Sequence, residues 1–174
     1  MTETLTPDIC VIGAGSGGLT VAAAVAAFGV PVVLIEKGRM GGDCLNTGCV
    51  PSKSLIAAAR HAHGMPRAKL FGISARGVEV DFARVHAHVH EVIAAIAPND
   101  SREPFEALGV RVINGAARFR DPDTVMVGLP AGGEIDIRAR RFVIATGSSP
   151  TLPPIAGIDT GGRPEQFRCD GRGS

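Results

Sequence analysis

The sequence contains no tryptophan and no tyrosine, and only seven of its 174 residues are phenylalanine. Proteins that bind single-stranded nucleic acid stack bases on aromatic side chains, so a site of this type is not expected. The 18 basic and 17 acidic side chains nearly cancel and leave a formal charge of +1. The chain therefore lacks the basic excess typical of proteins that bind nucleic acid or anionic membranes.

Charged residues are also missing from residues 9–35, a run long enough to span a bilayer. Glycines interrupt the run where a β-α-β unit would turn, which favours a soluble, cytoplasmic protein. Residues 1–8 contain Glu3 and Asp8 but no lysine or arginine, so they lack the pattern of a signal peptide. In a cytoplasmic chain, the four cysteines indicate redox or metal chemistry more than a structural disulfide framework.

Hydrophobic patterning predicts an α/β fold, a Rossmann-like domain with a parallel sheet. Buried strands are expected at 8–12, 32–35 and 141–145, and an alanine-rich helix at 17–28. A second helix is expected at 50–63, with Pro51 in its first turn. A longer helix begins after Asp81, the expected N-cap, and ends near Pro98.

The second half of the sequence predicts an inserted antiparallel β-meander. After a short helical piece that ends at Gly109, strands are expected at 110–113, 116–119, 124–127 and 134–137, separated by turn residues. Residues 1–157 are expected to form one domain. Residues 158–174 are expected to form an irregular tail, because they are polar and rich in glycine.

A glycine-rich turn with the pattern G-x-G-x-x-G follows the first strand. Its residues are Gly13, Ala14, Gly15, Ser16, Gly17 and Gly18. The turn opens a helix and precedes a strand that ends at Glu36, the context of a dinucleotide-binding fingerprint. Gly13 permits the tight turn, Gly15 lets the backbone approach a pyrophosphate, and Gly18 allows close helix–strand packing. The helix N-terminus adds free N–H groups for the phosphates.

Glu36 can accept hydrogen bonds from both hydroxyl groups of a ribose. A carboxylate at this position argues against a 2′-phosphate, so we expect an adenosine with a free 2′-hydroxyl group. A glycine-rich turn that serves only packing is the alternative.

Two cysteines lie in the segment Gly41-Gly-Asp-Cys-Leu-Asn-Thr-Gly-Cys-Val-Pro-Ser-Lys53. Four residues between Cys44 and Cys49 allow a disulfide that forms and breaks readily. Cys49 lies near the N-terminus of the next helix, where the dipole favours a thiolate. Zinc ligation, a structural disulfide and two simple buried cysteines remain alternatives. Cys10, within the first strand, is expected to be a small core residue.

Together these motifs resemble those of the class I pyridine nucleotide–disulfide oxidoreductases, the family of dihydrolipoamide dehydrogenase, glutathione reductase and mercuric reductase. The resemblance covers residues 8 to about 157, and its middle region looks more like the mercuric-reductase-like branch. Besides the cysteine segment, the matching stretches are Val11-Ile-Gly-Ala-Gly-Ser-Gly-Gly18, Leu34-Ile-Glu-Lys37 and Val143-Ile-Ala-Thr-Gly147.

The resemblance implies that FAD binds along the first β-α-β unit. Besides the fingerprint, the cofactor-binding residues that it implies are Glu36, Lys37, Gly42, Asp43, Lys53, Ala116, Ala117, Thr146 and Gly147. Cys49 would face the flavin as the charge-transfer thiol, and Cys44 would be the interchange thiol that attacks the substrate. Lys53 would approach the flavin ring. Electrons would pass from NAD(P)H to FAD, to the Cys44–Cys49 disulfide, and then to a small disulfide, a lipoyl group or a mercuric ion.

The sequence also departs from the family. Asp43 stands where threonine is usual, near an expected phosphate or ribityl contact. We expect the nicotinamide-binding domain to be absent, together with the dimerisation domain and its His–Glu acid-base pair, so the homodimer of the full-length family is not expected for this chain. We therefore expect a truncated flavoprotein disulfide reductase. The alternative is a catalytically incompetent fragment that at most binds FAD.

Three histidines, His86, His88 and His90, lie on the helix expected after Asp81. His86 and His90 share a face, as a pair of metal ligands would. Without a carboxylate or a third ligand beside them, a solvated helix face is favoured, and no metal site is expected.

Overall fold

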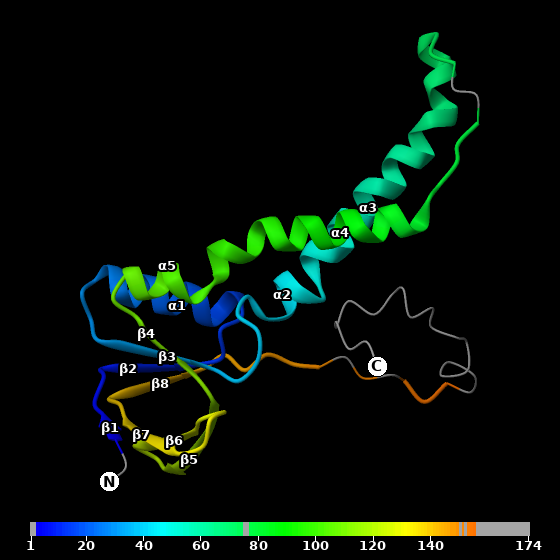
Figure 1. Cartoon of the computed structure of the whole chain (residues 1–174). Coiled ribbons are helices and arrows are strands. Elements are labelled where there is room, and N and C mark those ends of the chain that lie inside the picture. Colours follow the sequence, from blue (N-terminus) through cyan, green and yellow to red (C-terminus); the bar gives the residue numbers. More distant parts are fainter. Residues whose placement is uncertain (1–2, 75–76, 150, 152, 156–174) are drawn as a thin grey trace. The chain divides into compact units, whose positions relative to one another are not determined.

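The structure is a computed structural model that describes residues 3–74, 77–149, 151 and 153–155. The described residues fall into two compact units, one within residues 1–44 and 97–149 and one within residues 45–96 and 150–174 (Figure 1). The expected irregular tail, residues 158–174, lies outside the described residues.

Two four-stranded sheets form most of the first unit. The parallel sheet has the order β4-β3-β2-β8, with β2 (Ile9–Ile12), β3 (Val32–Glu36), β4 (Arg111–Asn114) and β8 (Arg141–Ile144). The second has the order β1-β7-β6-β5, with β1 (Glu3–Leu5), β5 (Ala116–Asp121), β6 (Thr124–Gly128) and β7 (Glu134–Arg138). β5, β6 and β7 form the predicted antiparallel meander, and β1 joins β7 in parallel.

The parallel sheet is buried on both faces, which is why β2 and β3 are apolar at consecutive positions. Val11 and Leu34 belong to a core shared with α1 (Ser16–Ala27) and α5 (Arg102–Ala107). Their neighbours Cys10 and Val33 belong to a second core, shared with the apolar side chains of the meander. The first unit therefore has three layers, with α1 and α5 on one side of the parallel sheet and the meander on the other (Figure 1).

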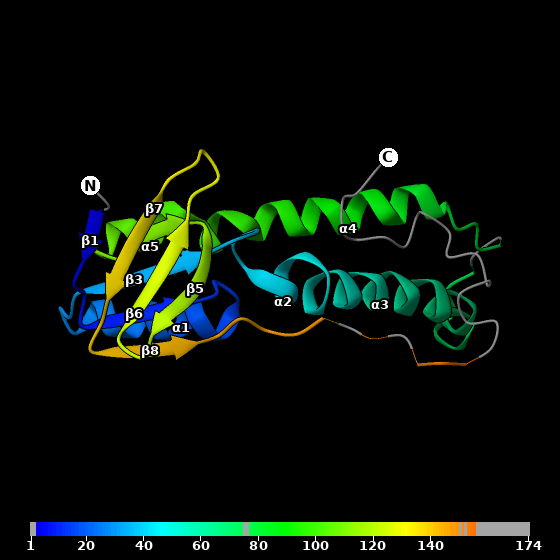
Figure 2. The same ribbon diagram turned by 90° about the horizontal axis from the view of Figure 1, so that it is seen from below.

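The second unit is built on two long helices that pack side by side, α3 (Cys49–Gly64) and α4 (Phe82–Ile96), with the 3-10 helix η1 (Met65–Phe71) after α3 (Figure 2). Asp81 caps α4 as predicted, because its side-chain oxygen accepts a hydrogen bond from the backbone N–H of Arg84 at 3.2 Å. The 3-10 helix η2 (Ala97–Asp100), which contains Pro98, follows α4 directly. None of the helices in the described ranges combines the length and apolar content needed to cross a membrane.

The predicted α/β class is confirmed, and each predicted helix and strand is found with ends that shift by a few residues. Four short elements were not predicted: β1, η1, η2 and the five-residue helix α2 (Gly42–Asn46). β1 depends on pairing with β7, about 130 residues further along the chain, which no local pattern reveals. α2 starts at a glycine with a positive φ of 57°, a residue type that typically marks loops.

Candidate functional site

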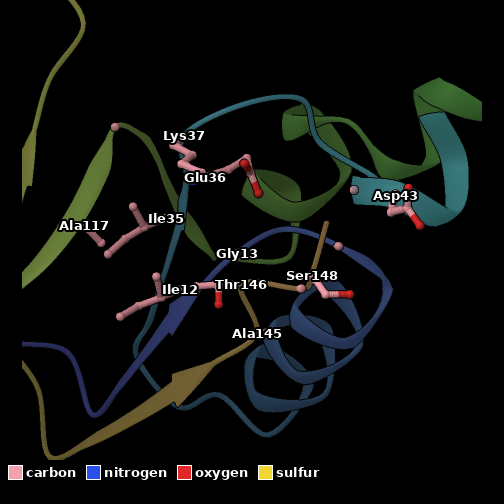
Figure 3. A pocket seen from close by; sticks show the side chains of 14 residues that line it. Ile12, Gly13, Ile35, Glu36, Lys37, Asp43, Ala117, Ala145, Thr146 and Ser148 are labelled. Atoms are coloured by element: carbon pink, nitrogen blue, oxygen red, sulfur yellow. The ribbon is translucent and has the colours of Figure 1, made fainter. Parts of the chain in front are cut away.

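An open cavity of about 240 Å³ lies at the carboxyl ends of the parallel strands, next to the start of α1 (Figure 3). Ligands of open α/β sheets bind at this edge, because loops and helix N-termini gather there. The lining residues come from the ends of β2, β3 and β8, the start of α2 and the meander: Ile12, Gly13, Gly15, Ile35, Glu36, Lys37, Gly42, Asp43, Gly115, Ala117, Ala145, Thr146, Gly147 and Ser148.

Two glycines of the fingerprint stand where no side chain fits. Gly13 has a φ of 105°, and a Cβ atom there would lie 2.3 Å from the carbonyl oxygen of Ala145. A Cβ atom on Gly18 would lie 1.8 Å from the carbonyl oxygen of Gly13. The tight turn and the close approach of α1 to β2 therefore require these glycines.

The loop after β3 is joined to the same turn. The N–H of Gly41 donates to the carbonyl oxygen of Ala14 at 2.9 Å. A Cβ atom on Gly42 would lie 2.6 Å from the Cα atom of Gly15. Only glycine allows this approach, and it brings Gly42 and Asp43 onto the wall of the cavity.

The carboxylate of Glu36 is held by two backbone donors. Its Oε2 accepts from the N–H of Ala14 at 2.6 Å, and its Oε1 accepts from the N–H of Gly38 at 2.7 Å. Each carboxylate oxygen has two lone pairs, so both can accept a further hydrogen bond from a ribose hydroxyl group. Glu36 thus has two roles, because its carboxylate fixes the glycine-rich turn and also lines the cavity.

Nine of the residues expected to bind the cofactor line the cavity: Gly13, Gly15, Glu36, Lys37, Gly42, Asp43, Ala117, Thr146 and Gly147. The other six, Ala14, Ser16, Gly17, Gly18, Lys53 and Ala116, are not among the lining residues. Sequence reasoning missed five lining residues, namely Ile12, Ile35, Gly115, Ala145 and Ser148. Gly115 carried no local sequence signal, because its need for glycine depends on Gly128: a Cβ atom there would lie 2.6 Å from the carbonyl oxygen of Gly128.

The two motif cysteines, Cys44 and Cys49, lie on two successive helices. Cys44 is in α2, belongs to the first unit and is half-buried. Cys49 is the first residue of α3, belongs to the second unit and is exposed. Lys53, one turn further along α3, is also exposed, and Pro51 lies in the first turn as predicted. Cys49 therefore lies at the N-terminus of α3, where the first backbone N–H groups of the helix have no partner within the helix.

Cys10 has the environment predicted for it. The residue is fully buried within β2, and this burial raises the pKa of its thiol to about 12. A thiol that stays protonated is a poor nucleophile, so Cys10 is a core residue and takes no part in thiol chemistry.

The residues present fit a dinucleotide such as FAD. The cavity wall contains backbone of Gly13 and Gly15 that no side chain shields, at the start of a 12-residue helix whose first N–H groups suit phosphates. The carboxylate of Glu36 at the end of β3 suits a ribose. A short apolar wall from Ile12, Ile35 and Ala117 completes the cavity.

Comparisons with known proteins agree with this geometry. Residues 7–171 match the family model described as "Pyridine nucleotide-disulphide oxidoreductase". The chain is 37% identical to mercuric reductase from Streptomyces lividans over 153 residues, which cover 87% of this chain and 32% of that protein. It is 36% identical to dihydrolipoyl dehydrogenase from Haloferax volcanii over 159 residues, which cover 90% of this chain and 33% of that protein.

A solved structure is also similar. It is a Cu(II) complex of the HOCl-induced flavoprotein disulfide reductase RclA from Escherichia coli, with a TM-score of 0.70 and 28% identity, covering 92% of this chain and 32% of that one. The chain spans about a third of the length of these relatives. On the family match, the chain belongs to the pyridine nucleotide-disulphide oxidoreductases, a family of FAD- and NAD(P)H-dependent enzymes.

Proposed function

We propose that this chain is the FAD-binding part of a flavoprotein reductase in which Cys44 and Cys49 exchange electrons with the substrate. The proposal rests on one observation: the first motif cysteine directly follows residues that line the dinucleotide cavity. Gly42 and Asp43 line the cavity, and Cys44 is the next residue. A thiol next to a dinucleotide cavity lies where it can exchange electrons with a redox-active group bound there.

In this proposal the first unit holds FAD by its nucleotide end. The backbone of Gly13 and Gly15 receives the pyrophosphate, Glu36 binds the adenosine ribose, and Ala117 lies near the adenine. Thr146 and Gly147 contact the middle of the cofactor. Asp43 must turn its carboxylate away from the phosphates, because two negative charges in one cavity repel. When bound, the flavin supplies the hydride and electron chemistry that side chains lack.

The cysteines supply the reversible electron store. Oxidation of the two thiols forms one S–S bond and releases two electrons and two protons, and reduction reverses this balance. Cys49, the first residue of α3, would be the inner thiol, next to the flavin. Cys44 would be the outer thiol, which attacks the substrate, and Lys53 would add positive charge to the flavin site.

The substrate class follows from the relatives' names. Mercuric reductases and a dihydrolipoyl dehydrogenase are among the similar proteins, so the proposed acceptors are a mercuric ion, a lipoyl group or another small disulfide. NAD(P)H is the proposed electron donor, the cytoplasm the proposed location, and a homodimer the proposed state of the whole enzyme. These proposals concern a whole enzyme, because this chain spans only about a third of the length of its relatives.

The test is a flavin spectrum of the full chain. We expect FAD to bind, and two-electron reduction with dithionite to produce a long-wavelength band from a thiolate next to oxidised flavin. Bound FAD that shows no such band on two-electron reduction would count against the coupling. Failure to bind FAD would count against the cavity assignment. Steady oxidation of NADH or NADPH by the isolated chain would exclude the alternative, a fragment that binds FAD without turnover.

A further inference from the structure

A pair of histidines on α4 has the geometry of two metal ligands. His86 and His90 are four positions apart, and their Nε2 atoms lie 3.2 Å from each other. Their ring centroids are 4.5 Å apart, with the rings inclined by 65°. Both side chains therefore turn the same nitrogen toward one point beside the helix.

The separation of the two nitrogens suits a single ion. Imidazole nitrogens lie about 2.0–2.1 Å from a bound zinc ion, and two nitrogens at that distance are about 2.8–3.4 Å apart when the angle at the ion is roughly 90° to 109°. The observed 3.2 Å falls within this range. An ion could thus be bound with little movement of either side chain.

The surroundings of the pair leave room for further ligands. His86 is half-buried and His90 is exposed. At about 100° per residue, the neighbours on the same side of the helix are Phe82, Ala83, Ile93 and Ala94, none of which carries a charge or a metal-binding group. Among the described residues there is no group of three or more His, Cys, Asp or Glu side chains that could hold a metal. Water must therefore complete the coordination.

We propose that His86 and His90 form an open two-histidine site for a divalent transition-metal ion, with Cu²⁺ the preferred ion. Imidazole ligands suit zinc, nickel and copper, and copper(II) binds most tightly in the divalent series. The ion takes the lone pairs of both Nε2 atoms, so each neutral ring carries its single proton on Nδ1 in the bound state. The ring whose Nε2 donates in the present contact therefore shifts that proton to Nδ1 when the ion binds. The site needs neither FAD nor the cysteines, so it stands independently of the proposed function.

The experiment is a titration of the full chain with CuCl₂, using protein without a histidine tag. The background carries Cys44→Ser, Cys49→Ser and Cys169→Ser, so that these thiols neither bind nor reduce the ion. In this background we expect one Cu²⁺ per chain and an electron paramagnetic resonance spectrum with coupling to two nitrogens.

Matched alanine variants identify the ligands. His86→Ala and His90→Ala should each weaken binding by roughly tenfold or more, since even loss of an outer partner of a ligand costs that much. His88→Ala, the control on the other side of α4, should leave binding unchanged. Alanine favours helix, so α4 should persist in all three variants, which circular dichroism checks. Equal binding by His86→Ala and the background, or equal weakening by His88→Ala, would overturn the proposal.

Discussion

Adjacent glycines at the start of α1 offer a matched test of the dinucleotide turn. A Cβ atom on Gly18 would lie 1.8 Å from the carbonyl oxygen of Gly13, whereas one on Gly17 would meet no atom within 4 Å. Both residues are helical and neither has a positive φ. The Gly17→Ala and Gly18→Ala substitutions therefore differ almost only in packing.

The two variants should change the free energy of unfolding in opposite directions. Gly17→Ala should stabilise the chain by up to about 1 kcal/mol, because alanine loses less conformational freedom in a helix than glycine. Gly18→Ala gains the same conformational stabilisation. Its new Cβ atom would clash with the carbonyl oxygen of Gly13, however, and relieving this clash requires α1 to move away from the strand by about 1.5 Å. Overpacking of this kind costs about 3 kcal/mol, which leaves a net loss of about 2 kcal/mol.

The assay is urea unfolding followed by circular dichroism at 222 nm, since the chain has no tryptophan or tyrosine whose fluorescence could report. In thermal scans the predicted net loss corresponds to a lowering of Tm by about 4–8 °C for a chain of this size. If Gly18→Ala proves as stable as Gly17→Ala, the close approach of α1 to the Gly13 carbonyl is refuted.

Three further predictions concern Cys10, Asp81 and Glu36. Cys10 should resist iodoacetamide in the folded chain while Cys49 reacts, because burial raises the pKa of Cys10 to about 12. Equal alkylation rates for the two cysteines would contradict the burial of Cys10. The folded chain keeps the Cys10 thiol proton at pH values where the unfolded chain loses it, so the free energy of unfolding should fall as the pH rises toward 12. Asp81→Ala should destabilise α4 by about 1 kcal/mol in urea unfolding, whereas Asp81→Asn should retain the cap, and no difference between them would contradict the capping bond. In Glu36→Gln, an amide NH₂ group replaces one of the two carboxylate oxygens that accept from backbone N–H groups. FAD binding, measured by flavin fluorescence, should therefore weaken by roughly ten- to a hundredfold. Unchanged affinity would exclude a role for the charge of Glu36.

Local sequence patterns were sufficient where an element's own residues decide its structure. The apolar run of β2, the alanines of α1 and the cap at Asp81 each carry a short-range signal. The same holds for Gly13, whose positive φ makes glycine necessary.

Contacts between residues far apart in the chain could not be predicted from the sequence. β1 exists through its pairing with β7, and Gly115 lines the cavity because the Gly128 carbonyl leaves no room for a side chain. The facing Nε2 atoms of His86 and His90 depend on side-chain rotamers, which spacing alone does not determine. The sequence also predicted Glu36 as a ribose ligand without revealing its two bonds to the turn.

The proposed electron path requires Cys49 to be the inner thiol, next to the flavin, and Cys44 to be the outer one. Visible absorption spectra of the Cys44→Ser and Cys49→Ser variants, each loaded with FAD, test it most directly. In Cys44→Ser, the remaining Cys49 cannot form the disulfide, so its thiolate should give a long-wavelength band without added reductant. Cys49→Ser should give no such band. The reverse pattern, or no band in either variant with FAD bound, would rule out Cys49 as the inner thiol.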